Sequence, residues 1–377
     1  MLMKKLCFSS LILLSLVLCS YPAFGQEVEE EKAPADEEQE RVDVSGLFYI
    51  AIEEGELLGE ELGRFFLGRA YLTVETKVLP FLSARMTLDA NQDLAGDGRG
   101  DMELRIKYAF GKFHFPDWRA FRKLNLEAGI VHMVWLDFEE HINLYRMRAP
   151  MFMERSGIFN SADFGATFAG SFGDNMEEYA KLVNSKYSAR RGSFALGVYN
   201  GGGYHGVEVN SNKALEGRFT FRPLPESFAG LQISGLFIVG DGNIDDEGQE
   251  PPDWETFNIF GSYEHRRGAF TAQYAWGEGN QRGNWTEPDD PYEATPFSGW
   301  ALFGEWRFGP HWRATGGYDR FERMEGSRDN SFNRIYAGVG YDLGKENIIL
   351  FDYDRRVWDD TTLPIDNRFQ VVLQIKF

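Results

Sequence analysis

Apolar and polar residues alternate along many segments of this chain, most clearly over 366–377. One phase of that segment is apolar and holds Phe369, Val371, Leu373, Ile375 and Phe377, while the other phase is mostly polar. Successive side chains of an extended strand point to opposite faces, so a period of two predicts a strand with one apolar and one polar face. The same period recurs upstream, for example over 82–89, 215–222, 300–308 and 334–342. The pattern therefore predicts an all-β protein.

Sixteen such strands fit between residues 44 and 377. Their predicted ranges are 44–53, 65–78, 81–89, 102–114, 122–134, 163–172, 192–199, 213–223, 229–239, 255–265, 268–278, 297–308, 311–321, 331–342, 346–357 and 366–377. Short connections such as 266–267 alternate with longer ones rich in Gly, Asp, Asn or Pro, such as 279–296. Segment 173–191 falls where a short turn is expected but is too long for one. We expect it to hold a short helix or a strand pair, which makes eighteen strands the alternative count.

Composition separates a membrane barrel from other kinds of protein. Aromatic residues make up 15% of the chain, yet the mean hydropathy is −0.38. That balance excludes a helical membrane protein, which needs several apolar runs of about 20 residues, and a disordered chain, which has few large apolar side chains. Several apolar faces end in Trp or Tyr, as the interfacial girdles of a lipid-embedded barrel do. We therefore predict a transmembrane antiparallel β-barrel over 44–377, in preference to a soluble sandwich.

Residues 1–25 have the features of a secretory signal peptide. Lys4 and Lys5 precede a short apolar stretch, and the small-x-small sequence Ala23-Phe24-Gly25 predicts cleavage before Gln26. Export combined with a membrane barrel predicts a location in the outer membrane of a Gram-negative bacterium.

The next segment, 26–43, is rich in Asp and Glu and has little to bury, so we expect it to be an acidic flexible segment. Cys7 and Cys19 are the two cysteines of the chain, and both precede this segment. A lipoprotein signal ending at Cys19 is the competing interpretation of the leader.

Charge and motif content limit the possible functions. The formal net charge of −19 argues against a nucleic-acid partner. The six histidines are scattered without the spacing of metal ligands, and no motif places a Ser, a His and an acid in a catalytic arrangement. We therefore expect no enzymatic activity, no metal site and no cofactor.

The longest connection, 135–162, is rich in charged residues, and the sequence around it resembles a known family. The segments that carry the resemblance are Met153-Glu154-Arg155, Phe164-Gly165, Leu196 to Gly201, Asn212-Lys213 and Gly217 to Pro223. Their order and spacing, clearest over about 125–240, resemble the phosphate- and polyphosphate-selective porins (porins O and P). The strand that ends on Phe377 is also similar to the closing strand of bacterial outer-membrane proteins.

The resemblance implies a sixteen-stranded, usually trimeric anion channel whose third external loop folds inward and narrows the pore. By position, 135–162 matches that constriction loop. Arg146, Arg148 and Arg155 match its arginine-bearing segment, and Arg218 matches a Gly-Arg strand of the family. A guanidinium group keeps its charge and offers a planar fork of donors to phosphate oxygens, so the implied chemistry is sound.

The charge balance of the chain departs from that family. Predicted lumen-facing cations and anions are nearly equal in number, Glu139 and Glu140 accompany the loop arginines, and 241–253 contains acids but no Lys or Arg. An acidic mouth repels phosphate, so a general porin is the broader expectation. The early strands face the incoming loop, which adds three wall residues to the predicted selectivity residues: Arg85, Arg105 and Lys107.

The function expected from the sequence is an outer-membrane porin for passive diffusion of small hydrophilic solutes or ions, with anions such as phosphate as one option. The alternative is a non-conducting surface, adhesion or scaffold barrel whose lumen is plugged by 135–162 and 173–191. The expected partners are outer-membrane lipid, lipopolysaccharide, small polar solutes or inorganic ions, and further copies of the chain in a homotrimer.

Overall fold

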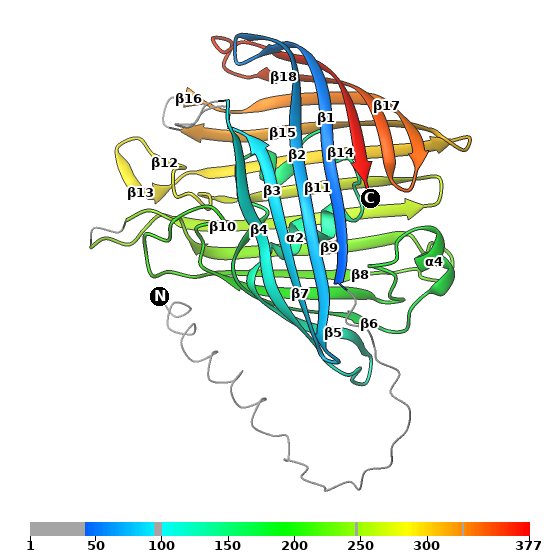
Figure 1. Ribbon diagram of the computed structural model, residues 1–377. Coiled ribbons are helices and arrows are strands. Elements are labelled where there is room, and N and C mark those ends of the chain that lie inside the picture. Colours follow the sequence, from blue (N-terminus) through cyan, green and yellow to red (C-terminus); the bar gives the residue numbers. More distant parts are fainter. Residues whose placement is uncertain (1–41, 94–99, 246–247, 326–327) are drawn as a thin grey trace, which may run out of the picture. The chain divides into compact units, whose positions relative to one another are not determined.

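The computed structural model describes residues 42–93, 100–245, 248–325 and 328–377. The predicted signal peptide, and the predicted acidic segment up to residue 41, lie outside these residues. The described residues form a closed antiparallel β-barrel (Figure 1). Among them, no helix has both the length and the apolar character needed to cross a membrane.

Sixteen strands form the barrel wall, and each pairs with its neighbours in chain order. They are β1 (Val42–Leu57), β2 (Glu60–Leu79), β3 (Leu82–Gln92), β4 (Met102–His114), β5 (Phe121–His132), β6 (Ala162–Phe172), β7 (Gly192–Tyr199), β8 (Ala214–Phe221), β9 (Leu231–Asp241), β10 (Asp253–His265), β11 (Gly268–Glu278), β14 (Pro296–Phe308), β15 (Trp312–Glu325), β17 (Phe332–Gly344), β18 (Asn347–Trp358) and β19 (Asp366–Lys376). The two-residue β16 (Arg328–Asp329) pairs with the end of β15, and β12 (Thr286–Glu287) forms a separate hairpin with β13 (Asp290–Ala294). The predicted count of sixteen is confirmed, and the alternative of eighteen is wrong.

The barrel closes where β19 pairs with β1, in a register that runs from Leu47 opposite Lys376 to Glu56 opposite Asn367. Backbone bonds between Gly46 and Phe377 continue this pairing at 2.9 and 3.0 Å. A Cβ atom on Gly46 would lie 2.3 Å from the Phe377 ring, so a larger residue at this position would displace that ring. Closure gives every strand a partner on both sides, and a barrel in lipid needs this because lipid offers no hydrogen bonds.

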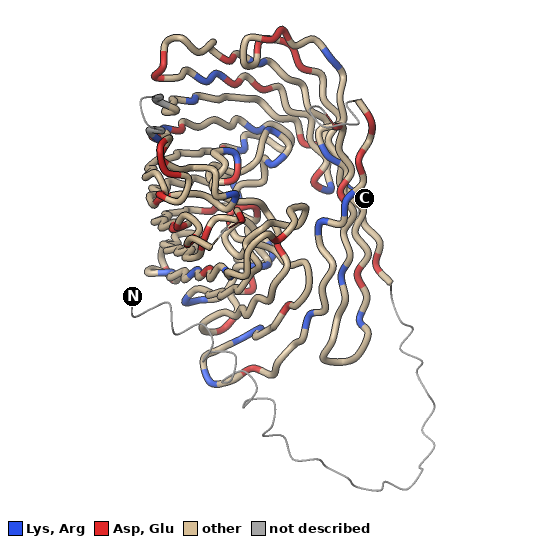
Figure 2. Tube along the Cα trace, turned by 90° about the vertical axis from the view of Figure 1, so that its left-hand side faces the viewer, with Lys and Arg blue, Asp and Glu red and all other residues tan. Residues whose placement is uncertain are grey.

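The two faces of the wall differ as the alternation predicts. On β19, Phe369 is 61% exposed and its neighbour Gln370 is 4% exposed. Trp306 and Phe351 also point outward from their strands, while Ala301 is buried inside. The outer face is therefore apolar and the inner face is largely polar, which suits a wall between lipid and an aqueous interior. Figure 2 shows acidic and basic residues interspersed along the strands.

The segment 133–161 between β5 and β6 folds against the inner face of the wall. It contains α2 (Val134–Glu140), which Figure 1 shows within the space enclosed by the strands, and α3 (Phe152–Arg155). We call 133–161 the inward loop. Its large apolar side chains are buried in one cluster with wall residues such as Phe260 of β10; the loop members are Met133, Trp135, Leu136, Phe138, Ile142, Met151, Phe152, Met153, Ile158 and Phe159.

The long turn 173–191 contains a short helix, α4 (Glu177–Leu182), so the predicted helix is present in place of a strand pair. This turn also reaches the inner face, because Tyr179 and Asn184 each donate a hydrogen bond of 3.0 Å to Glu264 of β10. Asn184 Nδ2 donates to the His141 carbonyl of the inward loop at 3.1 Å. Two segments that enter from opposite ends of the wall therefore meet inside the barrel.

Candidate functional site in the barrel interior

The inward loop begins on a carboxylate that the wall supplies. Glu216 of β8 is buried, and it accepts hydrogen bonds from the backbone N–H groups of Val134 at 2.8 Å and Trp135 at 3.0 Å. The first N–H groups of a helix have no partner within the helix, and the residue before α2, Met133, provides no side-chain cap. A negative charge at the N-terminus of a helix also interacts favourably with the helix dipole. Glu216 therefore sets where the loop enters the barrel.

Glu139 lies near the end of α2 and is held on both carboxylate oxygens. Trp135 Nε1 donates to it at 2.9 Å, and Gln273 Nε2 of β11 donates at 2.7 Å. Burial raises the pKa of Glu139 to about 7, because the charged form loses its hydration. The structure places this predicted selectivity residue in a loop-to-wall contact, away from solvent.

Three charged residues of the inward loop, Glu140, Arg146 and Glu154, form one cluster. Arg146 donates to Glu154 through both terminal nitrogens and lies 2.8 Å from Glu140. Burial opposes ionisation of Glu154, but the Arg146 guanidinium outweighs it and holds the pKa of Glu154 below its ordinary value. Lys107 and Arg69 of the wall lower that pKa further. The cluster therefore faces the β2–β4 side of the barrel.

Arg148 and Arg155 join the loop to the other side of the barrel. Arg148 contacts Asp352 of β18 with Nε at 2.8 Å and Nη2 at 2.7 Å, and its guanidinium lies 4.6 Å from the ring of Tyr336. Arg155 pairs with Asp319 of β15 and donates to its own loop at the Pro150 carbonyl. Both arginines therefore hold carboxylates of the wall.

Arg218 of β8 lies beneath the loop. Its guanidinium is buried, donates to Ser193 at 2.9 Å and to Thr220 at 2.6 Å, and stacks 4.4 Å from the Phe138 ring. No carboxylate among the described residues lies within ion-pair distance of it. This position makes Arg218 a packing partner of α2.

The remaining predicted residues lie on β3 and β4, beside Arg69 of β2; the arginines stay partly open, while Lys107 is buried at 4% exposure. The side chains of Arg69, Arg85 and Arg105 are 32%, 30% and 26% exposed. Asp89 pairs with Arg69 at 2.9 Å and approaches Arg105 at 3.9 Å, so one buried carboxylate serves two guanidinium groups. Lys107 lies over the Tyr71 ring at 4.7 Å, with no described carboxylate within ion-pair distance. We call Arg69, Arg85, Arg105 and Lys107 the cationic wall.

The predicted site residues therefore divide into three groups: those of the cationic wall, the charges of the inward loop, and Arg218 beneath that loop. Those of the cationic wall line one side, while most loop charges are engaged in contacts that hold the loop. Alternation places Glu216, Asp319 and Asp352 on the inner face, but it carries no information on which loop residue each one meets. Within the described residues, no group of three or more His, Cys, Asp or Glu side chains could hold a metal ion.

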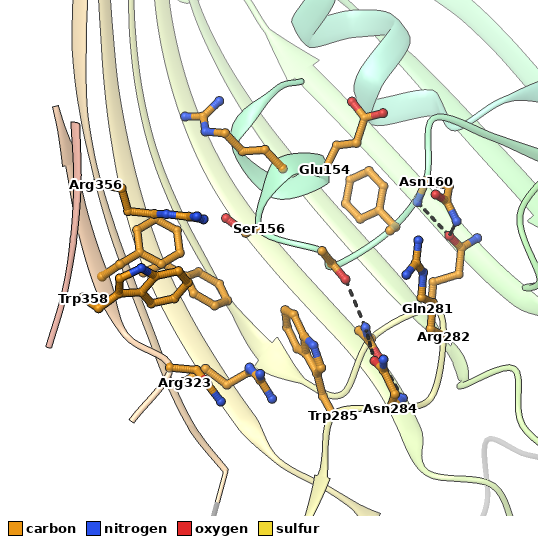
Figure 3. A pocket seen from close by; sticks show the side chains of 17 residues that line it. Glu154, Ser156, Asn160, Gln281, Arg282, Asn284, Trp285, Arg323, Arg356 and Trp358 are labelled. Carbon is orange, nitrogen blue, oxygen red and sulfur yellow. Dashed lines mark hydrogen bonds between the residues drawn. The ribbon is translucent and has the colours of Figure 1, made fainter. Parts of the chain in front are cut away.

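A cavity of about 290 Å³ lies beside α3, where loops from several strands meet (Figure 3). Arg155, Arg282, Arg323 and Arg356 line it together with Trp285, Trp358 and several amide side chains. Arg282 comes from the long connection 279–295, which has no strand alternation, so no sequence signal predicted it. Arg155 also lines a space of about 10 Å³ beside Arg148.

Comparison of the sequence with known families and curated proteins finds no match. No family model matches the chain, and a search of curated proteins finds no matching relative. The specific resemblance to phosphate-selective porins therefore stays a prediction.

Solved structures of outer-membrane proteins are similar in fold. The Salmonella typhi OmpF complex with daunomycin shares 15% identity and a TM-score of 0.64, over 90% of this chain and 98% of that chain. The outer-membrane channel DcaP of Acinetobacter baumannii gives 13% and 0.55, over 89% and 97%. The trimer form of OmpT from Vibrio cholerae gives 11% and 0.55, over 89% and 99%. The chain therefore has the sixteen-stranded barrel fold of outer-membrane porins.

Proposed function

We propose that this protein is an outer-membrane porin through which small hydrophilic solutes and ions diffuse passively, without a catalytic step or a cofactor. The observation that carries the proposal is the cationic wall, whose three arginine side chains are 26–32% exposed inside a barrel with an apolar outer face. Each of these arginines has a carboxylate within ion-pair distance but keeps a quarter to a third of its side chain exposed, which favours contact with water, because the removal of charges from water is costly even when they are paired. A water-containing interior within a closed membrane barrel supports diffusion of solutes.

The inward loop is the proposed constriction. Its Glu140, Arg146 and Glu154 cluster faces the cationic wall, so a solute passing there meets acids on the loop side and guanidinium groups on the wall side. Such a transverse field favours small polar solutes. We propose Arg85, Arg105 and Lys107 as the wall half of the selectivity site and Glu140 with Arg146 as the loop half.

Selectivity for phosphate receives less support than general diffusion. Arg146, Arg148 and Arg155 each hold a carboxylate at hydrogen-bond distance, so a phosphate ion would have to displace that carboxylate first. Paired guanidinium groups offer fewer free donors and less net charge to a passing anion. We therefore propose weak charge selectivity.

The outer face supports a placement in the membrane, and a similar solved structure supports an assembly. Exposed apolar side chains such as Phe369 and Trp306 suit contact with lipid, and the similar OmpT structure is described as a trimer. We propose an outer-membrane location, contact with lipid and lipopolysaccharide, and a homotrimer.

The test is electrical recording from purified protein in planar bilayers under a salt gradient. Stepwise insertions with steady conductance and a small reversal potential are expected, with no block by millimolar phosphate. A large anion-side potential with phosphate block would overturn the proposed weak selectivity and favour the phosphate-selective family.

A second candidate function is a non-conducting surface or scaffold barrel. The observation that favours it is the contact between the inward loop and the 173–191 turn, where Tyr187 donates to Asp137 at 2.9 Å and packs on Phe138 with ring centroids 4.9 Å apart. Two segments that meet across the interior could close it. Absence of current across many insertions of folded protein would select this candidate.

A further inference from the structure

The cavity beside α3 collects more positive than negative charge. Four arginines line it, and Glu154, the single carboxylate among the described lining residues, is already engaged by Arg146. Arg155 and Arg356 are balanced by Asp319 and by Asp366, neither of which lines the cavity. A guanidinium group has five N–H donors, so one paired with a carboxylate keeps others for a second acceptor.

Arg282 differs from the other three arginines. Its side chain is exposed, and no described residue pairs with it by a hydrogen bond, an ion pair or ring stacking. Figure 3 shows its guanidinium beside Gln281, on the side of the cavity opposite Arg356 and Trp358. An exposed cation at the rim, with further guanidinium groups deeper in, is suited to capture an anion from water.

The segment that carries Arg282 is fixed to the inward loop. Gln281 N–H donates to the Ile158 carbonyl at 2.9 Å, Gln281 Oε1 accepts from the Asn160 N–H at 2.7 Å, and Asn280 Nδ2 donates to the Gly157 carbonyl at 3.1 Å. These contacts hold both sides of the cavity in place without a ligand. A site that is already ordered loses less entropy when a ligand binds.

Two tryptophan rings in the lining of the cavity pack against two of its arginines. Arg323 lies 4.7 Å from the Trp285 ring and Arg356 lies 4.3 Å from the Trp358 ring. Amide and hydroxyl groups of Asn284 and Ser156 complete the lining and can bond to hydroxyl groups. Guanidinium groups with neutral donors and acceptors around them fit an oxyanion on a hydroxylated skeleton.

We propose that this cavity is a binding site for a small hydroxylated organic anion, of the class of sugar phosphates and sugar acids. The oxyanion would contact Arg282 together with Arg323 or Arg356, and the hydroxyl groups would contact Asn284 and Ser156. The volume of about 290 Å³ lies at the lower end of small-molecule pockets, about 300–1,000 Å³, and so suits one monosaccharide-sized molecule. A role of this cavity as the first binding site for a solute that enters the channel rests on the proposed function, but binding itself does not require conduction.

The experiment measures binding by calorimetry on the full-length folded protein in detergent. The probes are glucose 6-phosphate, glucuronate, inorganic phosphate and glucose. Saturable binding of either sugar anion, tighter than that of inorganic phosphate or glucose, is expected, and the tighter of the two identifies the oxyanion. Equal affinity for inorganic phosphate would overturn the hydroxylated skeleton, and no saturable binding of either sugar anion would overturn the site.

The variants locate the site. Arg282→Ala is expected to weaken binding by about tenfold, the loss of one charge-assisted hydrogen bond, and Arg282→Lys is expected to weaken it less. Arg266→Ala is the matched control, because Arg266 is also exposed but lies in the tight turn between β10 and β11. Unchanged affinity in Arg282→Ala, or an equal loss in Arg266→Ala, would overturn the assignment. Because binding is measured without current, a silent channel with intact binding would refute the proposed function alone.

Discussion

Arg148 joins the inward loop to β18, and its removal tests whether that loop controls the pore. The side chains of Arg148 and Asp352 are 5% and 0% exposed, and two nitrogen-to-oxygen contacts of 2.8 and 2.7 Å join them. Removal of one partner of a buried ion pair costs about 3–5 kcal/mol, because the other charge stays buried without compensation. At about 1.4 kcal/mol per factor of ten, Arg148→Met should raise the population with a detached loop by about two to three and a half orders of magnitude.

The assay combines single-channel recording with thiol labelling. Arg148→Met should show higher conductance and more open-channel noise than the unchanged protein, because the detached loop no longer narrows the interior. The two cysteines of the chain, Cys7 and Cys19, precede the barrel, so a cysteine introduced by Ala149→Cys is the single thiol of the barrel region. It should be labelled faster when Arg148 is replaced.

The control is Arg190→Met. Arg190 pairs with Glu226, and these side chains are exposed, so the loss of their ion pair should change little. The double variant Arg148→Met with Asp352→Asn should be less perturbed than the sum of the two single variants, since the buried carboxylate charge is also removed. If Arg148→Met matches Arg190→Met in conductance, noise and labelling rate, the pair does not hold the loop and the reasoning is refuted.

Three further outcomes are expected. Glu216→Gln leaves one N–H of α2 without its carboxylate acceptor at a cost of about 1–3 kcal/mol, so it should also raise channel noise; unchanged noise would argue against the wall-supplied cap. Burial raises the pKa of Glu139 from 4.5 to about 7, so the stability that protonated Glu139 contributes is full below about pH 4.5 and is lost as pH rises through about 7. The thermal unfolding temperature should therefore fall over this pH range, and Glu139→Gln should make the fall smaller. Gly46→Val should lower the yield of heat-modifiable folded barrel, because its Cβ would meet the Phe377 ring, and Phe377→Ala should restore part of that yield unless closure tolerates the clash.

The wall of the barrel was predictable because alternation is a local property. The predicted ranges 102–114, 192–199 and 268–278 coincide with β4, β7 and β11, since each of these strands has a clear apolar phase bounded by turn residues. The hairpin of β12 and β13 was not predicted, because such short strands carry no period. The sequence of 173–191 is compatible with a helix and with a strand pair, since a stretch of that length carries signals for both.

The interior was predictable only in part. The inward course of 135–162 followed from a resemblance, and the phase of each strand placed Asp319 and Asp352 on the inner face. What neither source could predict is pairing across the lumen, because Arg148 and Asp352 are 204 positions apart in the chain. The exposed Arg282 lies in a connection without periodicity, so only the fold brings it to the cavity.

The pairing of β1 with β19 has a consequence for the order of assembly. Any shorter product that ends before β19 has two strand edges whose N–H and C=O groups lack partners, and lipid cannot supply them. The first strand must therefore wait, outside the hydrocarbon or shielded from it, until more than three hundred further residues have been made and delivered. Membrane insertion and completion of the barrel are for this reason expected to be a single late event, and damage confined to β19 should abolish the whole wall rather than one sixteenth of it.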